Sequence, residues 1–531
     1  MLNGNPDSAS SDRICISSDS SSSSGVGSPI ALIAFACWVS LSVAVGVCYA
    51  VSSSTPESVP QPPAARLTQN DSDLLEAISR RSFRYFWEQA NPITGLILDR
   101  ARTDGKPEDD PKHKNVASIA ATGFGLTALS IANEHHWVSH ELARKRVLTT
   151  LRFFVDRAPQ EHGWFYHYMD AAKGQRVWHC EVSSIDTALL LAGILTARQA
   201  FAGDPEIDRL ATAIYYRVDF GWMLDGSATT LRHGWKPEMG FSSYSWDTYS
   251  ELMILYLLAI GSPTHPISPA SWYAWKLPVT QMGGYTYIGG GPLFIQQYSQ
   301  AWVDLRHRLV VPIVPSESFV PRLNYFANAV AATRAQQAAA TDLSRQFPGY
   351  SSNIWGITAS DSIHGYVAWG GSSQDPRIDG TVVPSAAGGS LMFTPDICIP
   401  ALRTMLTRYG SKIWGRYGFA DAFNPTTGWV SQYVIAIDTG ITLLSAENVR
   451  TGNVWRWFMS NPEADWALNR VGLVRDPSYS LQDDAKLRAA SGRGAIDGAA
   501  REQISPQIPV FWDADPPPAG STSIMPMYSR Q

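Results

Sequence analysis

The chain has 531 residues, of which 45% are hydrophobic and 17% are charged, and its formal net charge is −5. A nearly balanced charge without a basic stripe excludes a protein that binds nucleic acid by electrostatic attraction, and it argues against anionic membrane surfaces as ligands. Many of the 19 Trp, 21 Tyr and 19 Phe residues must lie in a core. Such an excess of aromatic rings nevertheless favours a neutral, ring-shaped ligand.

The N-terminal part predicts export. Residues 1–29 are rich in serine, and we expect them to be disordered. Residues 30–51 carry no charge and are long enough to span a bilayer as one transmembrane helix. A signal anchor in the inner membrane, facing the periplasm, is the first interpretation, and cleavage after Ala50, giving a periplasmic or secreted protein, is the second. Residues 52–68 are expected to form a linker.

Residues 69–474 are expected to form one folded domain, because apolar helical patterns recur and no internal linker interrupts them. The first helix is expected to be capped by Asp71 or Ser72 and to run to Trp87. Further helices are expected at 118–133, 139–158, 183–201, 206–220, 245–260, 294–306, 322–347, 396–410, 432–446 and 463–469. Strand signals are confined to short pieces at 286–288 and in 365–385.

About a dozen helices joined by aromatic, glycine-rich loops predict an all-α fold, a toroid of helices whose loops at one end build a site. After residue 474 the chain becomes polar, and we expect 475–531 to be a partly disordered tail. The body holds two cysteines, Cys180 and Cys398, without metal-type spacing, so neither a metal site nor a cofactor is expected. The two thiols either form one bridge or, as we favour, stay separate and buried.

The first segment with candidate chemistry is 180–193. Ser183 and Asp186 fit a capping box at the start of an apolar helix. Asp186 therefore has a structural interpretation beside a catalytic one. Glu181 precedes that helix in a loop that also carries Trp178 and His179. A loop carboxylate among aromatic rings, next to a helix N-terminus, is better placed for catalysis than the cap itself.

The second segment is 243–266, where aromatic and acidic residues stand at the head of an apolar helix that ends at Gly261. Asp247 and Glu251 are four residues apart and would share one helix face. Uncharged residues follow Glu251, so partial burial is expected to raise its pKa, as a general acid requires. The alternatives are a solvated helix start whose acids complement the helix dipole, or a carboxylate held in a core network.

Three more segments combine acids, amides and aromatic rings. Residues 289–306 carry Gln297 on a helix with other polar groups that can bind sugar hydroxyls. Residues 355–366 place Asp361 on a glycine-punctuated loop, which either carries function or forms a simple turn. Residues 417–448 have a similar composition, but any one acid there is expected to be structural. The chain has no Gly-x-Ser-x-Gly motif, so serine hydrolysis is not expected.

Together these segments resemble the glycoamylase-like group, which includes the endo-β-1,2-glucanases of glycoside hydrolase family 144 and the glycoamylase-like domains of cyclic β-1,2-glucan synthases. The matching blocks begin at Glu181, Glu251, Gly291, Trp355, Asp379 and Tyr417. The resemblance implies an (α/α)6 barrel with a broad glycan cleft at one face and acid-assisted cleavage of β-1,2-glucan. It also implies that the essential carboxylates fall in the first two of these blocks.

The leading hypothesis is therefore a glycoside hydrolase that cleaves β-linked glucan, with β-1,2-glucan as the first choice. Glu251 would be the general acid and Glu181 the base, with Asp186 and Asp361 as supporting carboxylates. The side chains expected to hold sugar rings are Trp164, Trp246, Tyr285, Gln297, Trp355 and Tyr366. A transglycosylase with the same cleft and a non-catalytic glycan-binding protein of the cell envelope remain as alternatives. A monomer is expected.

Overall fold

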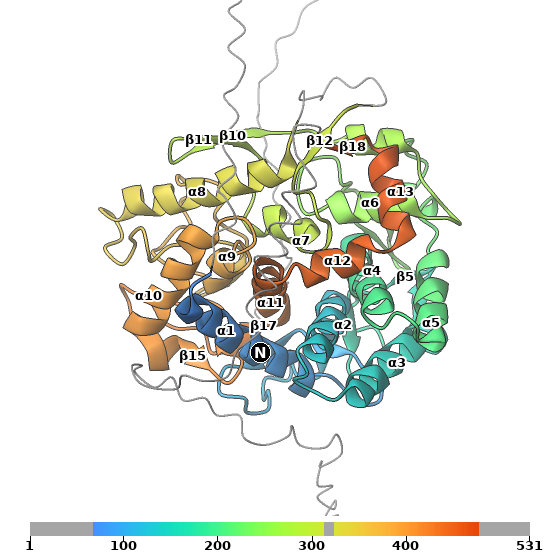
Figure 1. Ribbon diagram of the computed structural model, residues 1–531, viewed down its shortest axis with the longest axis horizontal. Helices are drawn as coiled ribbons and strands as arrows, with labels where there is room; N and C mark the ends of the chain where they lie inside the picture. Colours follow the sequence, from blue (N-terminus) through green and yellow to red (C-terminus); the bar gives the residue numbers. More distant parts are fainter. Residues whose placement is uncertain (1–66, 313–322, 477–531) are drawn as a thin grey trace, which may run out of the picture. The chain divides into compact units, whose positions relative to one another are not determined.

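The structure is a computed structural model that describes residues 67–312 and 323–476, and this part of the chain is mostly helical (Figure 1). The expected segments 1–29 and 30–51, most of the linker and nearly all of the tail lie outside the described residues. Within the described residues, no helix combines the length and the apolar character that crossing a membrane requires. Membrane anchoring, export and a monomeric state therefore stay predictions.

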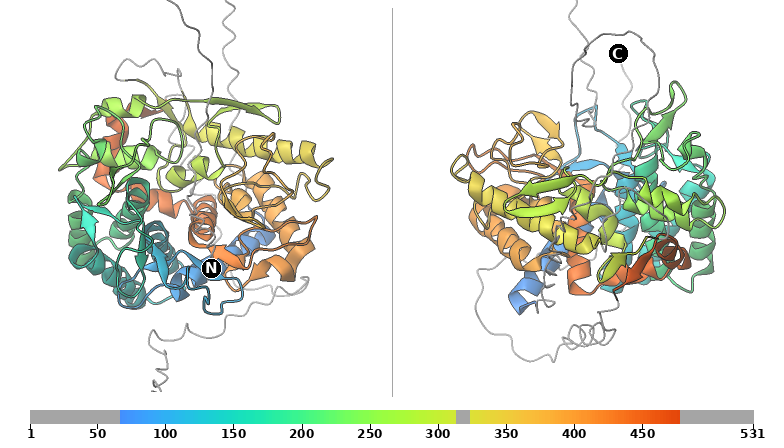
Figure 2. Two further views of the ribbon diagram at one scale, coloured as in Figure 1. Left: turned by 180° about the vertical axis from the view of Figure 1, so that it is seen from behind. Right: turned by 90° about the horizontal axis from the view of Figure 1, so that it is seen from above.

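Six helices are buried over nearly their whole surface, as helices without a polar face must be. These inner helices are α2 (Ile119–Glu134), α4 (Ser184–Ala200), α6 (Met253–Gly261), α7 (Phe294–Trp302), α9 (Pro384–Gly388) and α11 (Ala436–Arg450). Six outer helices keep one side exposed: α1 (Gln69–Glu88), α3 (His140–Asp156), α5 (Pro205–Tyr216), α8 (Tyr325–Leu343), α10 (Pro395–Ile413) and α13 (Pro462–Arg470). In Figures 1 and 2, α11 lies among α1, α2, α7, α9 and the short helix α12 (Asn453–Met459).

The inner helices α2 and α4 meet at glycines. A Cβ atom on Gly193 would lie 2.0 Å from the carbonyl oxygen of Gly123, and one on Gly123 would lie 2.3 Å from the carbonyl oxygen of Leu189. Only a hydrogen atom fits at these two positions, so the helix backbones touch. This close contact fixes the position of α4, and with it the acidic residue in its first turn.

Short antiparallel strands build the loops that join the helices. Two three-stranded sheets contain β1 (Ile97–Leu98), β3 (Val116–Ser118) and β6 (Tyr168–Asp170), and β7 (Val182–Ser183), β8 (Gly234–Lys236) and β9 (Gly240–Phe241). The two-stranded pairs are β2 (Arg100–Arg102) with β17 (Tyr433–Ile435), β4 (Gln160–Glu161) with β5 (Trp164–Phe165), β10 (Val279–Met282) with β11 (Tyr285–Ile288), β12 (Arg308–Val310) with β18 (Leu473–Arg475), β13 (Ser360–Ser362) with β14 (Gly365–Val367), and β15 (Trp414–Gly415) with β16 (Gly418–Phe419). Three strands, β3, β7 and β17, run directly into the inner helices α2, α4 and α11.

Most expected helices are present, with differences at their ends. The helix expected at 183–201 is α4, and Ser183 caps it by accepting a hydrogen bond from the backbone N–H of Asp186. Helix α1 starts earlier than expected, because Thr68 forms a capping box with Asp71. Helices α9 and α12 were not expected. The fold is mostly helical. Strands β11 and β14 lie where short strand pieces were expected, and the other paired strands were not expected.

The two cysteines of the body are separate. Cys180 and Cys398 are both free and buried, as the favoured interpretation predicted. Burial raises the pKa of the Cys180 thiol to about 11 and that of the Cys398 thiol to about 12. Both thiols therefore stay protonated at neutral pH and act as packing groups.

Candidate active site

Three acids stand at the N-terminal ends of inner helices. Asp186 lies in the first turn of α4, Asp438 lies in the first turn of α11, and Glu251 comes two residues before α6. The three acids lie near one another although they are far apart in the sequence. The charge of Asp186 acts on Glu251. Burial, followed by the charges of Asp438 and Glu251 among others, raises the pKa of Tyr298, a residue of α7.

Glu251 is set up to hold a proton at neutral pH. Its side chain is partly buried at the entrance of α6, and its backbone carbonyl accepts a hydrogen bond of 2.5 Å from the Ser299 hydroxyl. Desolvation by burial, with a further contribution from the Asp186 charge, raises the pKa of Glu251 to about 7. A carboxyl group that is still protonated near neutral pH can donate its proton to a leaving group.

Glu181, in contrast, is held in its ionised form. His167 Nδ1 donates to Glu181 Oε1 at 2.9 Å, and His167 Nε2 lies 3.4 Å from Asp186 Oδ2. Burial opposes ionisation of Glu181, but the hydrogen bond and the charge of His167 outweigh it, and Lys236 adds a smaller effect. Together they hold the pKa of Glu181 at about 2. Glu181 is thus a carboxylate at every physiological pH, and a third of its side chain stays exposed.

Asp186 connects these two acids. Ser183 donates its hydroxyl proton to Asp186 Oδ2 at 2.6 Å and caps α4 at the same time. Burial raises the pKa of Asp186, and the charge of Glu181 adds to the rise while His167 opposes it. The cap that the sequence predicts is therefore present, and the same carboxyl group also belongs to the acid cluster. His167 links Glu181 to Asp186, and Asp186 in turn acts on Glu251.

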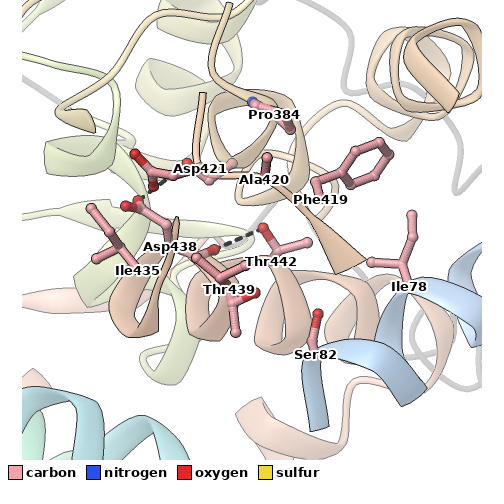
Figure 3. A pocket seen from close by; sticks show the side chains of 12 residues that line it. Ile78, Ser82, Pro384, Phe419, Ala420, Asp421, Ile435, Asp438, Thr439 and Thr442 are labelled. Carbon is pink, nitrogen blue, oxygen red and sulfur yellow. Dashed lines mark hydrogen bonds between the residues drawn. The ribbon is translucent and has the colours of Figure 1, made fainter. Parts of the chain in front are cut away.

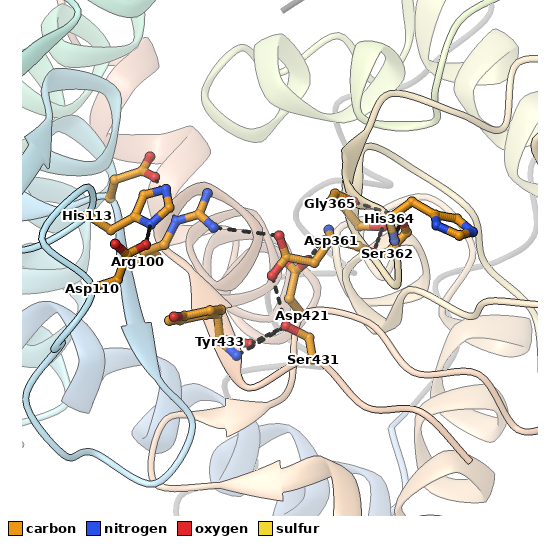
Figure 4. A network of polar contacts seen from close by, with 12 residues as sticks. Arg100, Asp110, His113, Asp361, Ser362, His364, Gly365, Asp421, Ser431 and Tyr433 are labelled. Carbon is orange, nitrogen blue, oxygen red and sulfur yellow. Dashed lines mark hydrogen bonds and ion pairs between the residues drawn. The ribbon is translucent and has the colours of Figure 1, made fainter. Parts of the chain in front are cut away.

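A second acid cluster lies around Asp361 (Figure 4). The guanidinium of Arg100 lies 3.6 Å from Asp361 Oδ1, and the Ser431 hydroxyl donates to Asp361 Oδ2 at 2.8 Å. The backbone N–H of Asp361 donates to Asp421 Oδ2 at 2.7 Å. Asp361 is 8% exposed, so it supports the cluster from inside the protein and not from its surface.

The carboxyl groups of Asp421 and Asp438 lie close to each other (Figure 3), and each affects the pKa of the other. Burial, and then the charge of Asp438, raises the pKa of Asp421. Burial also raises the pKa of Asp438, whose Oδ1 accepts a hydrogen bond of 3.1 Å from the Ser385 hydroxyl. Both side chains line a small cavity between α1, α9 and α11, together with Ser82 and other hydroxyl-bearing residues. Two like charges in direct contact favour a single shared proton.

Three side chains expected to hold sugar rings lie in the core instead. Trp164 and Trp355 are 0% exposed and Gln297 is 1% exposed. Trp164 Nε1 donates to the carbonyl oxygen of Asp219 at 2.8 Å, and Gln297 Nε2 donates to the Ser390 hydroxyl at 2.7 Å. A ring without an exposed face cannot stack on a sugar. These three expectations are corrected: the side chains are buried in the core.

The other three residues expected to bind sugar are not fully buried. Trp246 is 9% exposed, and its Nε1 donates to the Ser184 hydroxyl at 2.8 Å, so the ring is close to the acids but largely covered. Tyr285 on β11 is 38% exposed and Tyr366 on β14 is 37% exposed. Tyr366 is the strand partner of Asp361 in the pair β13–β14, which places it at the second acid cluster.

Asp247 and Glu251 do not share a helix face. Helix α6 starts only at Met253. The chain before it forms bends and a turn, and the backbone N–H of Lys276 donates to the Asp247 carbonyl at 2.8 Å. The carboxylate of Asp247 pairs with Lys276 at 3.1 Å and is 47% exposed. The predicted helix face is therefore wrong, and Asp247 is a surface acid outside the acid cluster.

Several groups of the site were not singled out from the sequence. His167 lies in an aromatic loop, and nothing in its sequence context indicates contact with two carboxylates. Arg100 and Asp438 carry no motif. Asp421 lies in the block beginning at Tyr417 that carries part of the resemblance, but it was interpreted as structural.

The chain is similar to known proteins. Residues 243–462 match the glycoamylase family model, described as "Putative glucoamylase". The exo-β-1,2-glucooligosaccharide sophorohydrolase (non-reducing end) of Parabacteroides distasonis is 28% identical over 453 residues, which make up 78% of this chain and 59% of that protein. The chain thus matches less than two thirds of the length of this curated relative.

Two solved structures share the fold. The endo-β-1,2-glucanase from Chitinophaga pinensis, in complex with sophorotriose and glucose, is 27% identical with a TM-score of 0.69, covering 76% of this chain and 98% of that one. The β-1,2-glucanase from Parabacteroides distasonis is 27% identical with a TM-score of 0.68, covering 76% of this chain and 60% of that one. The resemblance to glycoamylase-like proteins is thereby confirmed.

Proposed function

We propose that this chain, which resembles glycoamylase-like proteins, is a glycoside hydrolase that cleaves β-1,2-linked glucan. The observation that carries the proposal is the pair of acids with opposite environments. Burial raises the pKa of Glu251 to about 7, while His167 holds the pKa of Glu181 at about 2. One group keeps its proton and the other stays ionised, which is the division of work that glycoside cleavage needs. The β-1,2 linkage is supported by the names of the similar proteins.

In the proposed reaction, the Glu251 carboxyl group donates its proton to the glycosidic oxygen as the bond from that oxygen to the anomeric carbon breaks. Glu181 accepts a proton from the water molecule that supplies the new hydroxyl group. The products are two shorter chains, one of them with a new reducing end. Asp186 favours the protonated form of Glu251 through its charge, and His167 holds Glu181 in its ionised form.

We also infer an (α/α)6 toroid for residues 69–474. Six inner and six outer helices support this arrangement, since they alternate along most of the described chain. The acids at the inner-helix N-termini would then face a cleft at one end of the toroid.

The test measures release of reducing ends from linear β-1,2-glucan, with β-1,3- and β-1,4-glucans as comparison substrates. Glu251→Gln and Glu181→Gln should each lower kcat on β-1,2-glucan by at least about 100-fold. Asp247→Asn is the matched control, because this carboxylate is exposed and paired with Lys276. Full turnover by Glu251→Gln would remove this residue from the mechanism. If Glu181→Gln stays active and Asp421→Asn does not, the base belongs to the second acid cluster.

The same incubation separates the alternatives. A non-catalytic glycan-binding protein would bind β-1,2-glucan without producing new reducing ends. A transglycosylase would change the distribution of chain lengths while the number of reducing ends stayed constant. Either result would overturn hydrolysis as the function.

A further inference from the structure

A row of aromatic rings leads from the Glu181 cluster to the protein surface. The imidazole of His167, which contacts Glu181, stacks on the ring of Tyr168 with 3.8 Å between centroids and an interplanar angle of 17°. Tyr168 in turn contacts Trp178, with centroids 4.9 Å apart. Tyr168 is buried, whereas Trp178 at the end of the row is 40% exposed.

A second row starts at the N-terminus of the same helix. The indole of Trp246 donates to the hydroxyl of Ser184, the first residue of α4. The imidazole of His233 stacks on Trp246 with 3.9 Å between centroids and an angle of 21°. The next ring is that of Tyr244, whose centroid is 6.0 Å from that of His233 and whose side chain is 51% exposed. This row also ends in an exposed aromatic ring.

The two rows lie on opposite sides of the segment that carries Glu181. On one side, the backbone N–H of His167 donates to the carbonyl oxygen of Glu181 at 3.0 Å. On the other side, the backbone N–H of Ser184 donates to the carbonyl oxygen of His233 at 3.1 Å. The segment from Glu181 to Ser184 is therefore the middle strand, with the segment of His167 on one side and that of His233 on the other.

The position of Trp178 is held by a strained and braced backbone. Trp178 and His179 have φ angles of +54° and +47°. Residues other than glycine rarely adopt this left-handed region. Arg176 braces this turn by donating to the carbonyl oxygen of Cys180 at 2.5 Å and to both carboxylate oxygens of Glu238 at 2.6 and 3.0 Å. A large apolar ring is thus kept in solvent at a cost in backbone strain.

The exposed rings are not covered by parallel neighbours. The interplanar angle between Trp178 and Tyr168 is 60°, and that between Trp178 and His113 is 88°. The angle between Tyr244 and His233 is 39°. By contrast, the inner pair of each row is nearly parallel. The ring faces at the outer ends can therefore accept a flat apolar partner, such as the C–H face of a pyranose ring.

We propose that Trp178 and Tyr244 are stacking platforms for glucose units that lie away from the bond to be cleaved, one on each side of Glu181. This inference rests on the proposed function and extends it to the length of glucan that the site binds. The platforms act only on chains long enough to reach them, so they set a preference for long over short substrates.

The test compares linear β-1,2-glucan with the shortest β-1,2-oligosaccharide that the wild-type protein cleaves. Trp178→Ala and Tyr244→Ala should each raise KM for the long chain by roughly tenfold, the loss of about one ring contact. The kcat on the long chain and the kcat/KM on the short substrate should not change. Trp178→Phe and Tyr244→Phe keep an aromatic ring and should restore most of the affinity.

Trp466→Ala is the matched control, because Trp466 is 44% exposed on the outer helix α13. Equal KM values for Trp178→Ala, Tyr244→Ala and Trp466→Ala on the long chain would overturn the platforms while hydrolysis by the wild type stood. A fall in kcat/KM that is the same for both substrates would also overturn them, since it would indicate a structural role. Absence of cleavage by the wild type would instead overturn the proposed function.

Discussion

Replacing Glu251 with Gln should make the folded protein more stable above neutral pH while it removes activity. Burial raises the pKa of Glu251 from the usual 4.5 to about 7. Between these two pH values the folded state holds a proton on this residue that the unfolded chain has already released. Stability therefore falls as the pH rises through this interval, and the loss is complete above about pH 7. Glutamine has nearly the same shape and does not titrate, so the variant avoids this loss.

The size of the effect follows from the pKa values. A rise in pKa from 4.5 to about 7 corresponds to roughly 3 kcal/mol at about 1.4 kcal/mol per pH unit. This figure is an upper limit, because Glu251 is partly exposed and water screens its charge. At pH 5 the wild-type side chain is still protonated in the folded state and the loss of stability from ionisation of the unfolded chain has only begun, so most of the difference from titration still lies above pH 5.

The assay is equilibrium unfolding in urea at pH 5 and pH 8. The free energy of unfolding of Glu251→Gln, relative to the wild type, should increase by up to about 3 kcal/mol from pH 5 to pH 8. Asp104→Asn is the control: hydrogen bonding to Arg102 holds the pKa of Asp104 at about 2, so this carboxylate stays ionised at both pH values. A difference between Glu251→Gln and the wild type that is the same at pH 5 and pH 8 would refute the buried-acid argument.

Three further predictions follow from the same structure. The kcat/KM for β-1,2-glucan should fall above about pH 7 with a single deprotonation, because burial places the pKa of Glu251 there; a profile that is flat to pH 9 contradicts it. Gly193→Ala should lower the free energy of unfolding by more than about 3 kcal/mol in urea, since its Cβ would meet a backbone oxygen at 2.0 Å. Gly290→Ala is its control, because the nearest atom would be 3.5 Å away. Glu463→Gln should cost about 3–5 kcal/mol in the same assay, because it leaves the buried guanidinium of Arg198, now 2.6 Å from Glu463, without its counter-charge; a loss below about 1 kcal/mol would contradict this.

The sequence predicted the parts of the site that depend on local pattern. Ser183 and Asp186 cap an apolar run, and the structure shows this cap at the start of α4. The uncharged residues after Glu251 predicted burial and a raised pKa, and both are found. These features depend on neighbours within one helix or on the apolar character of the helix that follows, so the sequence alone carries the information.

The start of α6 depends on contacts that the sequence does not display. Residues 245–252 were expected to be helical, yet the chain there forms bends and a turn. Trp246 N–H donates to the carbonyl oxygen of Leu231, and Tyr249 N–H donates to that of Lys276. These bonds join segments that are distant in the sequence. Pairing between segments overrode local helix propensity.

The aromatic residues were the least predictable part of the site. Trp164 and Trp355 were expected to bind sugar, but they fill the core, whereas Trp178 and Tyr244 are exposed. Composition and spacing cannot separate a core indole from a surface one, since both occur in glycine-rich loops. Their exposure in the folded structure distinguishes the two classes.

The acids at the inner-helix N-termini show which of two opposing effects determines their protonation. The dipole of a helix stabilises a carboxylate at its N-terminus by about 0.3–1 kcal/mol, which would lower a pKa by less than one unit. Glu251 and Asp186 stand at such ends, and yet burial raises the pKa of both. The net rise of the Glu251 pKa from 4.5 to about 7 means that desolvation exceeds the dipole effect there. At a solvated helix start the dipole effect would exceed the desolvation effect, and the pKa of the acid would be lowered. An acid that a fold keeps protonated against a favourable dipole reduces stability at neutral pH, and the proton donation that we propose for Glu251 would give a reason for this cost.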